Sequence, residues 1–234
     1  MEKGFYEIFN YKKPIIGMIH LAGNSEQEKI NRALEEISIF EDEGISGALI
    51  EDYHGLPEDA INTLKAVSKK ETNLIIGINI LRNPYSGFQI ANEFGAKFIQ
   101  FDTVQTKDLN LDVYGAMREK YSDIVVLGGI RFKYTSPTGN TLEQDLYEGK
   151  SRCEAIVTTG KGTGIETPIQ KLRDFRNILG DYPLISGAGI NKNNIKEQLD
   201  VVDGVIVGSY LKHYNTKQKI DRMCVRELVQ AIKS

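Results

Sequence analysis

The sequence has 234 residues, of which 41% are hydrophobic and 26% charged, and a formal net charge of −3, which is typical of a globular protein. There is no basic surplus or basic stripe, so we expect no nucleic-acid partner. No apolar run approaches the ~18 residues of a membrane-spanning helix. The N-terminus lacks the apolar core of a signal peptide. We therefore expect a cytoplasmic protein without membrane insertion.

Short apolar runs alternate with helical patterns along the chain. The apolar runs cover 14–20, 47–52, 74–80, 97–102, 124–134, 154–159, 183–188 and 203–208. The helices that follow them are expected over 25–43, 57–70, 84–94, 112–120, 141–150, 168–179, 191–199 and 220–232. Continuous apolar strands between amphipathic helices indicate a parallel sheet with both faces covered. We predict an α/β fold in which residues 1–234 form a single (β/α)8 TIM-barrel domain, with a doubly wound open sheet as the alternative.

Glycine-bearing loops follow the seventh and eighth predicted strands, where barrels commonly bind phosphate. The backbone N–H groups of Gly187, Gly189, Gly208 and Ser209 are the candidate phosphate ligands, helped by a short helix that begins near Ser209. The alternative is that these glycines only make tight turns.

A third glycine-rich loop follows the sixth predicted strand and has no nucleotide P-loop spacing. We interpret it as a lid or a second ligand-binding loop, with a merely flexible connection as the alternative. Thr158 and Gly160 are its candidate substrate-binding residues.

Side-chain alternation along a strand selects which polar groups face into the barrel. In the fifth predicted strand, Ile130 and Phe132 suit the outer face, so Arg131 and Lys133 are expected inside. The other candidates for the barrel mouth are His20, Glu51, Asn79 and Asp102. A layer of mutually satisfied ion pairs is the alternative, but six polar groups that end four or five strands favour a reactive site.

Chemistry assigns candidate catalytic roles to four of these residues. Lys133 is suited to stabilise a carbonyl or enolate oxygen, or to act as a Schiff-base nucleophile. Asp102 or Glu51 is the candidate general base, and His20 the general acid or a metal ligand.

No compact metal-ligand motif is present, so we expect no cofactor. A divalent metal on His20 and nearby carboxylates is the alternative. The two cysteines, Cys153 and Cys224, form no CxxC and have no histidine nearby in the sequence. This pattern argues against both a disulfide framework and a zinc knuckle.

Six segments together resemble the BtpA family, also called the BtpA/SgcQ family. They are KPIIGMIHL (13–21), GINILRN (77–83), FKY (132–134), AIVTTGKGTG (155–164), ISGAGI (185–190) and DGVIVGSYLK (203–212). The resemblance implies a barrel of the ribulose-phosphate-binding kind. It also connects the chain with a cyanobacterial member associated with accumulation of photosystem I reaction-centre proteins, and with members grouped with sugar or nucleoside catabolism.

The resemblance also implies site residues when it is carried over by position. The family's residues fall on His20, Glu51, Asn79, Arg82, Lys133, Gly187, Gly189 and Gly208. The sequence departs from the family pattern in three places. The segment LAGNSEQ is shorter than expected and lacks proline, Gly128-Gly129 stands where an Ala-Asp pair is expected, and Tyr134 stands where a His is expected.

The leading hypothesis is an enzyme that acts on a small phosphorylated sugar or sugar-like substrate by isomerase, aldolase or lyase chemistry. Its candidate substrate-binding residues are Asn79, Arg82, Arg131, Thr158 and Gly160. A non-catalytic binding or assembly factor is the first alternative, favoured by the departures at 128–129 and 134. A nucleosidase or phosphorylase is the second. The expected partner is a phosphorylated small molecule, and a homodimer is the oligomer we consider because such barrels often pair through their helices.

Overall fold

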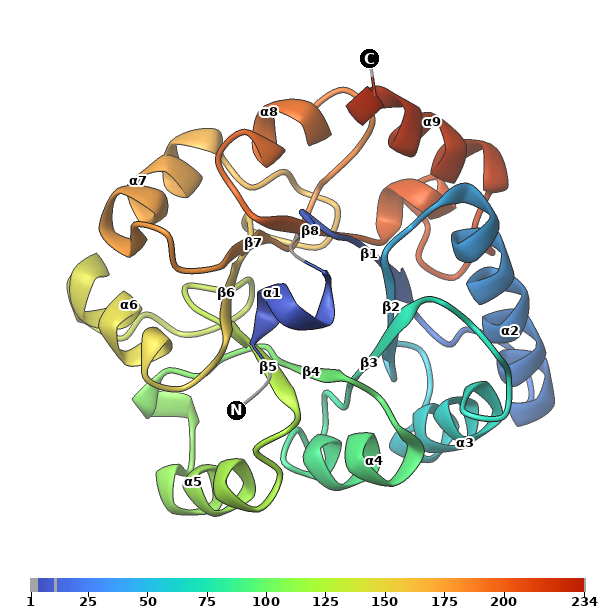
Figure 1. The fold of residues 1–234 in the computed structure, drawn as a ribbon, viewed down its shortest axis with the longest axis horizontal. Coiled ribbons are helices and arrows are strands. Elements are labelled where there is room, and N and C mark those ends of the chain that lie inside the picture. Colours follow the sequence, from blue (N-terminus) through green and yellow to red (C-terminus); the bar gives the residue numbers. More distant parts are fainter. Residues whose placement is uncertain (1–3, 11, 234) are drawn as a thin grey trace.

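The computed structural model describes residues 4–10 and 12–233. Within these ranges the strands are all parallel and pair in chain order, and β8 pairs with β1 to close a barrel (Figure 1). The strands are β1 (Ile15–Ile19), β2 (Gly47–Glu51), β3 (Ile75–Asn79), β4 (Phe98–Phe101), β5 (Val125–Gly129), β6 (Ala155–Thr158), β7 (Leu184–Ser186) and β8 (Gly204–Val207). The predicted TIM barrel is confirmed, and the open sheet is wrong.

At least one helix follows every strand, and these helices surround the barrel, whereas α1 precedes β1 (Figure 1). They are α1 (Phe5–Ile8), α2 (Glu26–Glu43), α3 (Pro57–Val67), α4 (Ser86–Phe94), η1 (Thr106–Asp108), α5 (Leu111–Lys120), α6 (Leu142–Lys150), α7 (Ile169–Leu179), α8 (Ile195–Leu199), η2 (Ser209–Lys212) and α9 (Arg222–Lys233). The short helix expected near Ser209 is η2. Within the described ranges, no helix is both long enough and apolar enough to span a membrane.

Helix α2 illustrates how the sequence fixes the outer layer. The Ser25 side chain accepts a hydrogen bond from the Glu28 backbone N–H and caps the helix start, and Gly44 ends the helix in the left-handed conformation. The helix buries Ala33, Ile37 and Phe40 against the sheet. A Cβ on Gly17 of β1 would lie 2.2 Å from the Phe40 ring, so the glycine lets the helix pack directly on the strand.

Helix α1 closes one end of the barrel. It lies across the central opening in the view down the barrel (Figure 1). Its Phe5 and the following Phe9 join the interior cluster, and the Phe9 ring lies 5.8 Å from the Phe98 ring of β4. This end is therefore filled with apolar side chains, which leaves the C-terminal ends of the strands for polar groups.

The barrel interior follows the expected alternation in the first strands. Ile16 and Met18 of β1 belong to the interior cluster with Leu49 of β2, whereas Ile15 and Ile19 belong to the cluster under the helices. His20 comes two residues after Met18, so it emerges on the inner side at the mouth.

The alternation fails after β5, which ends at Gly129 rather than continuing to residue 134. Arg131 has a left-handed backbone with φ 47, which reverses the direction of the side chains that follow. Phe132 therefore enters the interior cluster, and Arg131 turns outward so that its Nε donates to Asp145 Oδ2 of α6 at 2.7 Å. The predictions that Arg131 points inward and Phe132 outward are wrong.

Candidate functional site

Two carboxylates share one amide at the mouth of the barrel. Glu51 ends β2, Asn79 ends β3 and Asp102 directly follows β4. The Asn79 Nδ2 group donates to Glu51 Oε1 at 2.9 Å and to Asp102 Oδ1 at 3.1 Å, and Gln100 Nε2 donates to the same Asp102 oxygen at 2.8 Å. The inward orientation expected for Glu51, Asn79 and Asp102 is therefore observed.

The environment of Glu51 favours its protonated form. Burial, followed by the nearby charge of Asp102, raises the pKa of the Glu51 carboxyl to about 8. The Lys133 ammonium and the Asn79 amide act in the opposite direction without cancelling this effect. Glu51 is therefore a proton donor near neutral pH.

His20 lies between Glu51 and a buried lysine. Lys212, at the end of η2, is fully buried and donates to the Met18 carbonyl at 2.7 Å; its Nζ is 3.1 Å from His20 Nδ1. Since an ammonium has only donors, Nδ1 is the acceptor and Nε2 carries the imidazole proton, 3.9 Å from Glu51 Oε2. Burial and the charges of Lys212 and Lys133 lower the pKa of His20, which keeps the ring neutral.

Burial also affects Lys212 itself. It lowers the pKa of this ammonium to about 8, while the carboxylates of Glu36 and Glu51 act in the opposite direction. Lys212 therefore supplies a positive charge behind the imidazole at neutral pH and loses it in mildly alkaline solution.

Residues of the loops after β7 and β8 line a small hollow together with His20 and Glu51. Within the described residues, the N–H groups of Gly189, Gly208 and Ser209 and the Ser209 hydroxyl have no hydrogen-bond acceptor. We call these four donors the amide cradle. The Gly187 N–H differs, because it donates to the Thr158 carbonyl at 2.9 Å; the prediction that it is free to bind phosphate is wrong, although Gly187 still lines the hollow.

Lys133 lies beside the hollow that the amide cradle lines. Its side chain lines the same hollow as His20 and Glu51, and its ammonium has no ion-pair partner among residues 4–10 and 12–233. Its backbone N–H donates to Thr159 Oγ1 at 2.6 Å, which fixes the chain at this point. A cation that is not already neutralised by a protein carboxylate remains available to an anionic group of a ligand.

The loop after β6, residues 159–168, covers the hollow, and we call it the roof loop. Its Thr163 N–H donates to the Tyr134 hydroxyl at 3.1 Å, and Thr163 Oγ1 lies 3.3 Å from the Tyr53 hydroxyl. A Cβ on Gly189 would lie 2.2 Å from the Glu166 backbone, so the roof loop packs directly on the cradle. The hollow holds about 30 Å³, far less than the ~300–1,000 Å³ of typical ligand pockets, so we expect the roof loop to move when a ligand binds.

Asn79 and Asp102 line a neighbouring pocket rather than this hollow, and four other candidates line neither of the two. Arg131 lines a separate groove with Asn140 and Asp145, and Arg82 is exposed on the loop after β3. Thr158 is fully buried and its hydroxyl has no partner, whereas Gly160 packs on the Glu166 carbonyl, 2.4 Å from where its Cβ would be. The structure brings none of the four to the amide cradle.

Three side chains at the site were not among the sequence-based candidates. Lys212 supports His20, Gln100 supports Asp102, and Thr163 forms the roof. Gln100 could have been selected, because it shares a strand face with Asp102. The others are brought in by segments distant in the sequence.

The fold and the position of these groups define a (β/α)8 barrel with a polar, amide-lined site at the C-terminal ends of its strands. Within this class the chain belongs to the BtpA family, whose model matches residues 11–234. It is 26% identical to the photosystem I biogenesis protein BtpA of Synechocystis sp., over 97% of this chain and 90% of that protein.

Solved structures with the same architecture are more distant in sequence. The tryptophan synthase alpha chain of Legionella pneumophila superposes with a TM-score of 0.69 at 14% identity, over 96% of this chain and 93% of that one. The N-(5′-phosphoribosyl)anthranilate isomerase of Pyrococcus furiosus does so with a TM-score of 0.62 at 16% identity, over 94% of this chain and 98% of that one. At such identities the similarity supports the fold alone.

Proposed function

We propose that this chain is an enzyme that binds a small phosphorylated sugar-like compound and moves a proton next to its carbonyl group. The observation that carries the proposal is the convergence on one hollow of the amide cradle, the Lys133 ammonium and the Glu51 carboxyl. A structural ion-pair layer would neutralise its cations and pair its amides, which these groups do not do.

The roles follow from charge and position. The amide cradle would bind the phosphate oxygens, because unpaired N–H groups at the end of the barrel provide donors without a counter-charge. Lys133 would stabilise the oxygen on which negative charge develops as a carbon next to the carbonyl loses its proton. Glu51 is protonated near neutral pH, so it can return a proton to the substrate, and the Asp102 carboxyl group, which shares the Asn79 amide with Glu51, is the candidate base that removes one.

His20 would act in the same step as a neutral hydrogen-bond donor. Its Nε2–H lies on the side of Glu51, and Lys212 fixes this tautomer from behind. The side-chain amide of Asn79 donates a hydrogen bond to Glu51, and that of Gln100 donates one to Asp102. This donor set favours proton transfer over the divalent metal site that was the alternative for His20.

A titration with ribose 5-phosphate tests the phosphate role. A ligand at a hundredfold its Kd stabilises a protein by about 2.7 kcal/mol, so the free energy of unfolding of the wild type should rise by this amount when ribose 5-phosphate is present at a hundredfold its Kd. Ser209→Asp puts a carboxylate into the amide cradle and should abolish the rise. Ser151→Asp, at an exposed position after α6, is the matched control and should keep it.

Three results would distinguish an enzyme with phosphate in the amide cradle from the other interpretations. Equal stabilisation of wild type and Ser209→Asp would place the anion elsewhere, and no stabilisation by a panel of sugar phosphates would reject phosphate binding. Binding that requires Ser209, with no turnover of any bound compound, would favour the second candidate. That candidate is a non-catalytic binding or assembly factor, supported by the name of the Synechocystis relative and by the Gly128-Gly129 and Tyr134 departures.

A further inference from the structure

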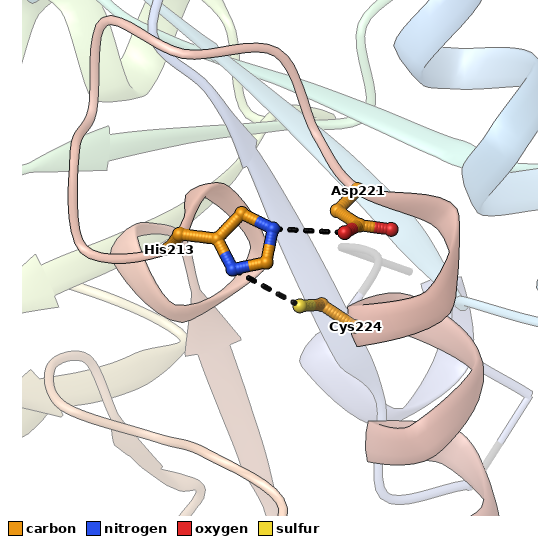
Figure 2. A group of neighbouring side chains, drawn as sticks. All are labelled: His213, Asp221 and Cys224. Carbon is orange, nitrogen blue, oxygen red and sulfur yellow. Dashed lines mark hydrogen bonds and ion pairs between the residues drawn. The ribbon is translucent and has the colours of Figure 1, made fainter.

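A histidine, an aspartate and a cysteine meet at the start of α9 (Figure 2). His213 directly follows η2, Asp221 precedes α9, and Cys224 lies in its first turn. His213 Nε2 is 2.8 Å from Asp221 Oδ2, and His213 Nδ1 is 4.0 Å from Cys224 Sγ. The imidazole therefore faces a carboxylate with one nitrogen and a thiol with the other.

The distance between nitrogen and sulfur suits a bridging cation. Zinc binds thiolate sulfur at about 2.3 Å and imidazole nitrogen at about 2.0–2.1 Å, so a Zn²⁺ ion between the two atoms separates them by at most about 4.4 Å. The observed 4.0 Å lies between this limit, which a linear arrangement would give, and the ~3.6 Å of a tetrahedral angle, so a side-chain shift of ~0.4 Å would complete tetrahedral geometry. Thiolate and imidazole are also the ligand types that select zinc and similar ions.

Asp221 provides the support that a metal-binding histidine needs. Such a histidine typically gives its other ring N–H to a carboxylate, which fixes the tautomer and the ring orientation. Asp221 accepts at Oδ2 from His213, and its Oδ1 accepts from the Met223 backbone N–H at 2.8 Å. The carboxylate is thus held on both sides, and Nδ1 is left as the nitrogen that faces the sulfur.

The local charge also favours a cation. The carboxylates of Asp221 and Glu227 lie three residues before and three residues after Cys224, about one helical turn away on each side. The Lys192 ammonium is already paired with Glu227 at 2.8 Å. A bound divalent ion would balance this negative charge and stabilise the thiolate that ligates it.

We propose that His213 Nδ1 and Cys224 Sγ bind a thiophilic divalent cation of the Zn²⁺ type, with Asp221 orienting the imidazole and water completing the coordination. The ion would tie the end of η2 to the start of α9. Since η2 begins with Ser209 and ends with Lys212, the ion would also stabilise the segment that carries part of the amide cradle. The proposal does not depend on the reaction proposed above.

Titration with Co²⁺ tests this site directly, because a cobalt–thiolate bond gives a charge-transfer absorption that carboxylate or imidazole ligands alone do not give. The wild type should develop this band with one equivalent of Co²⁺ and lose it when Zn²⁺ displaces the cobalt. Cys224→Ser should abolish the band, and Asp221→Asn, which keeps a capping side chain, should weaken Co²⁺ binding about 10–100-fold.

Two control variants test whether the cobalt–thiolate band comes from Cys224. Cys153→Ala removes the other cysteine, which is buried and contacts the Gly149 carbonyl, and should keep the band. Glu51→Gln should also keep it, which separates this site from the barrel mouth. A wild-type protein without the band, or a band that survives in Cys224→Ser, would overturn the proposal.

Discussion

The protonation of Glu51 has a consequence for stability that can be calculated. Its pKa is raised to about 8 in the folded chain from an ordinary value of 4.5. Below pH 4.5 the carboxyl is protonated in both states, and its stabilising contribution is fully present. As pH rises from 4.5 to about 8, the unfolded chain loses the proton and the folded chain keeps it, so this contribution is lost. At ~1.4 kcal/mol per pH unit, the total loss is about 5 kcal/mol.

Urea denaturation of the wild type and Glu51→Gln measures this loss. Between pH 5 and pH 9, the free energy of unfolding of the wild type should fall by about 4 kcal/mol more than that of the variant. Other groups that titrate in this range are present in both proteins, so the difference isolates Glu51 and its coupling to its neighbours. Glu119→Gln changes an exposed glutamate of α5 and should follow the wild type. Parallel pH profiles for wild type and Glu51→Gln would refute the reasoning.

Two further substitutions probe the same end of the barrel. Gly189→Ala should destabilise the fold by about 1–3 kcal/mol in urea denaturation, because φ is 68 and the new Cβ would meet the roof loop; its control, Gly115→Ala in the open part of α5, should stabilise by about 0.5–1 kcal/mol. A Gly189→Ala protein as stable as the wild type would contradict the close packing. Lys212→Met should cost about 1–3 kcal/mol, because it leaves the Met18 carbonyl and His20 Nδ1 without a donor. It should also raise the pKa of His20, and an unchanged imidazole titration by NMR would argue against the contact.

Strand alternation predicted much of the site correctly. The pairing of β1, β2 and β3 is regular up to the last residue of each strand that is paired. The side chains of Glu51 and Asn79, which end β2 and β3, and of His20, which follows β1, therefore point into the barrel as predicted. A side-chain period of two holds as long as the backbone remains extended. Arg131 lies beyond that limit, since its strand ends at Gly129 and the residue itself has a left-handed backbone. An arginine gives no sign of this conformation in the sequence, whereas a glycine would have suggested it.

Long-range contacts account for what the sequence could not predict. Lys212 reaches His20 only because β8 closes the barrel against β1. His213 and Cys224 are eleven residues apart and meet because the chain turns between η2 and α9. The glycines of the loops after β7 and β8 could be recognised in the sequence. The hydrogen bond from the Gly187 N–H to the Thr158 carbonyl could not, because it depends on the pairing of β6 with β7.

A crystal structure of the protein grown with ribose 5-phosphate would test the central claim most directly. The account predicts phosphate oxygens within ~2.7–3.2 Å of the backbone nitrogens of Gly189, Gly208 and Ser209, the roof loop displaced from its present position, and the sugar carbonyl end near Lys133 and Glu51. A sugar phosphate bound elsewhere, with the roof loop still closed over the amide cradle, would contradict it.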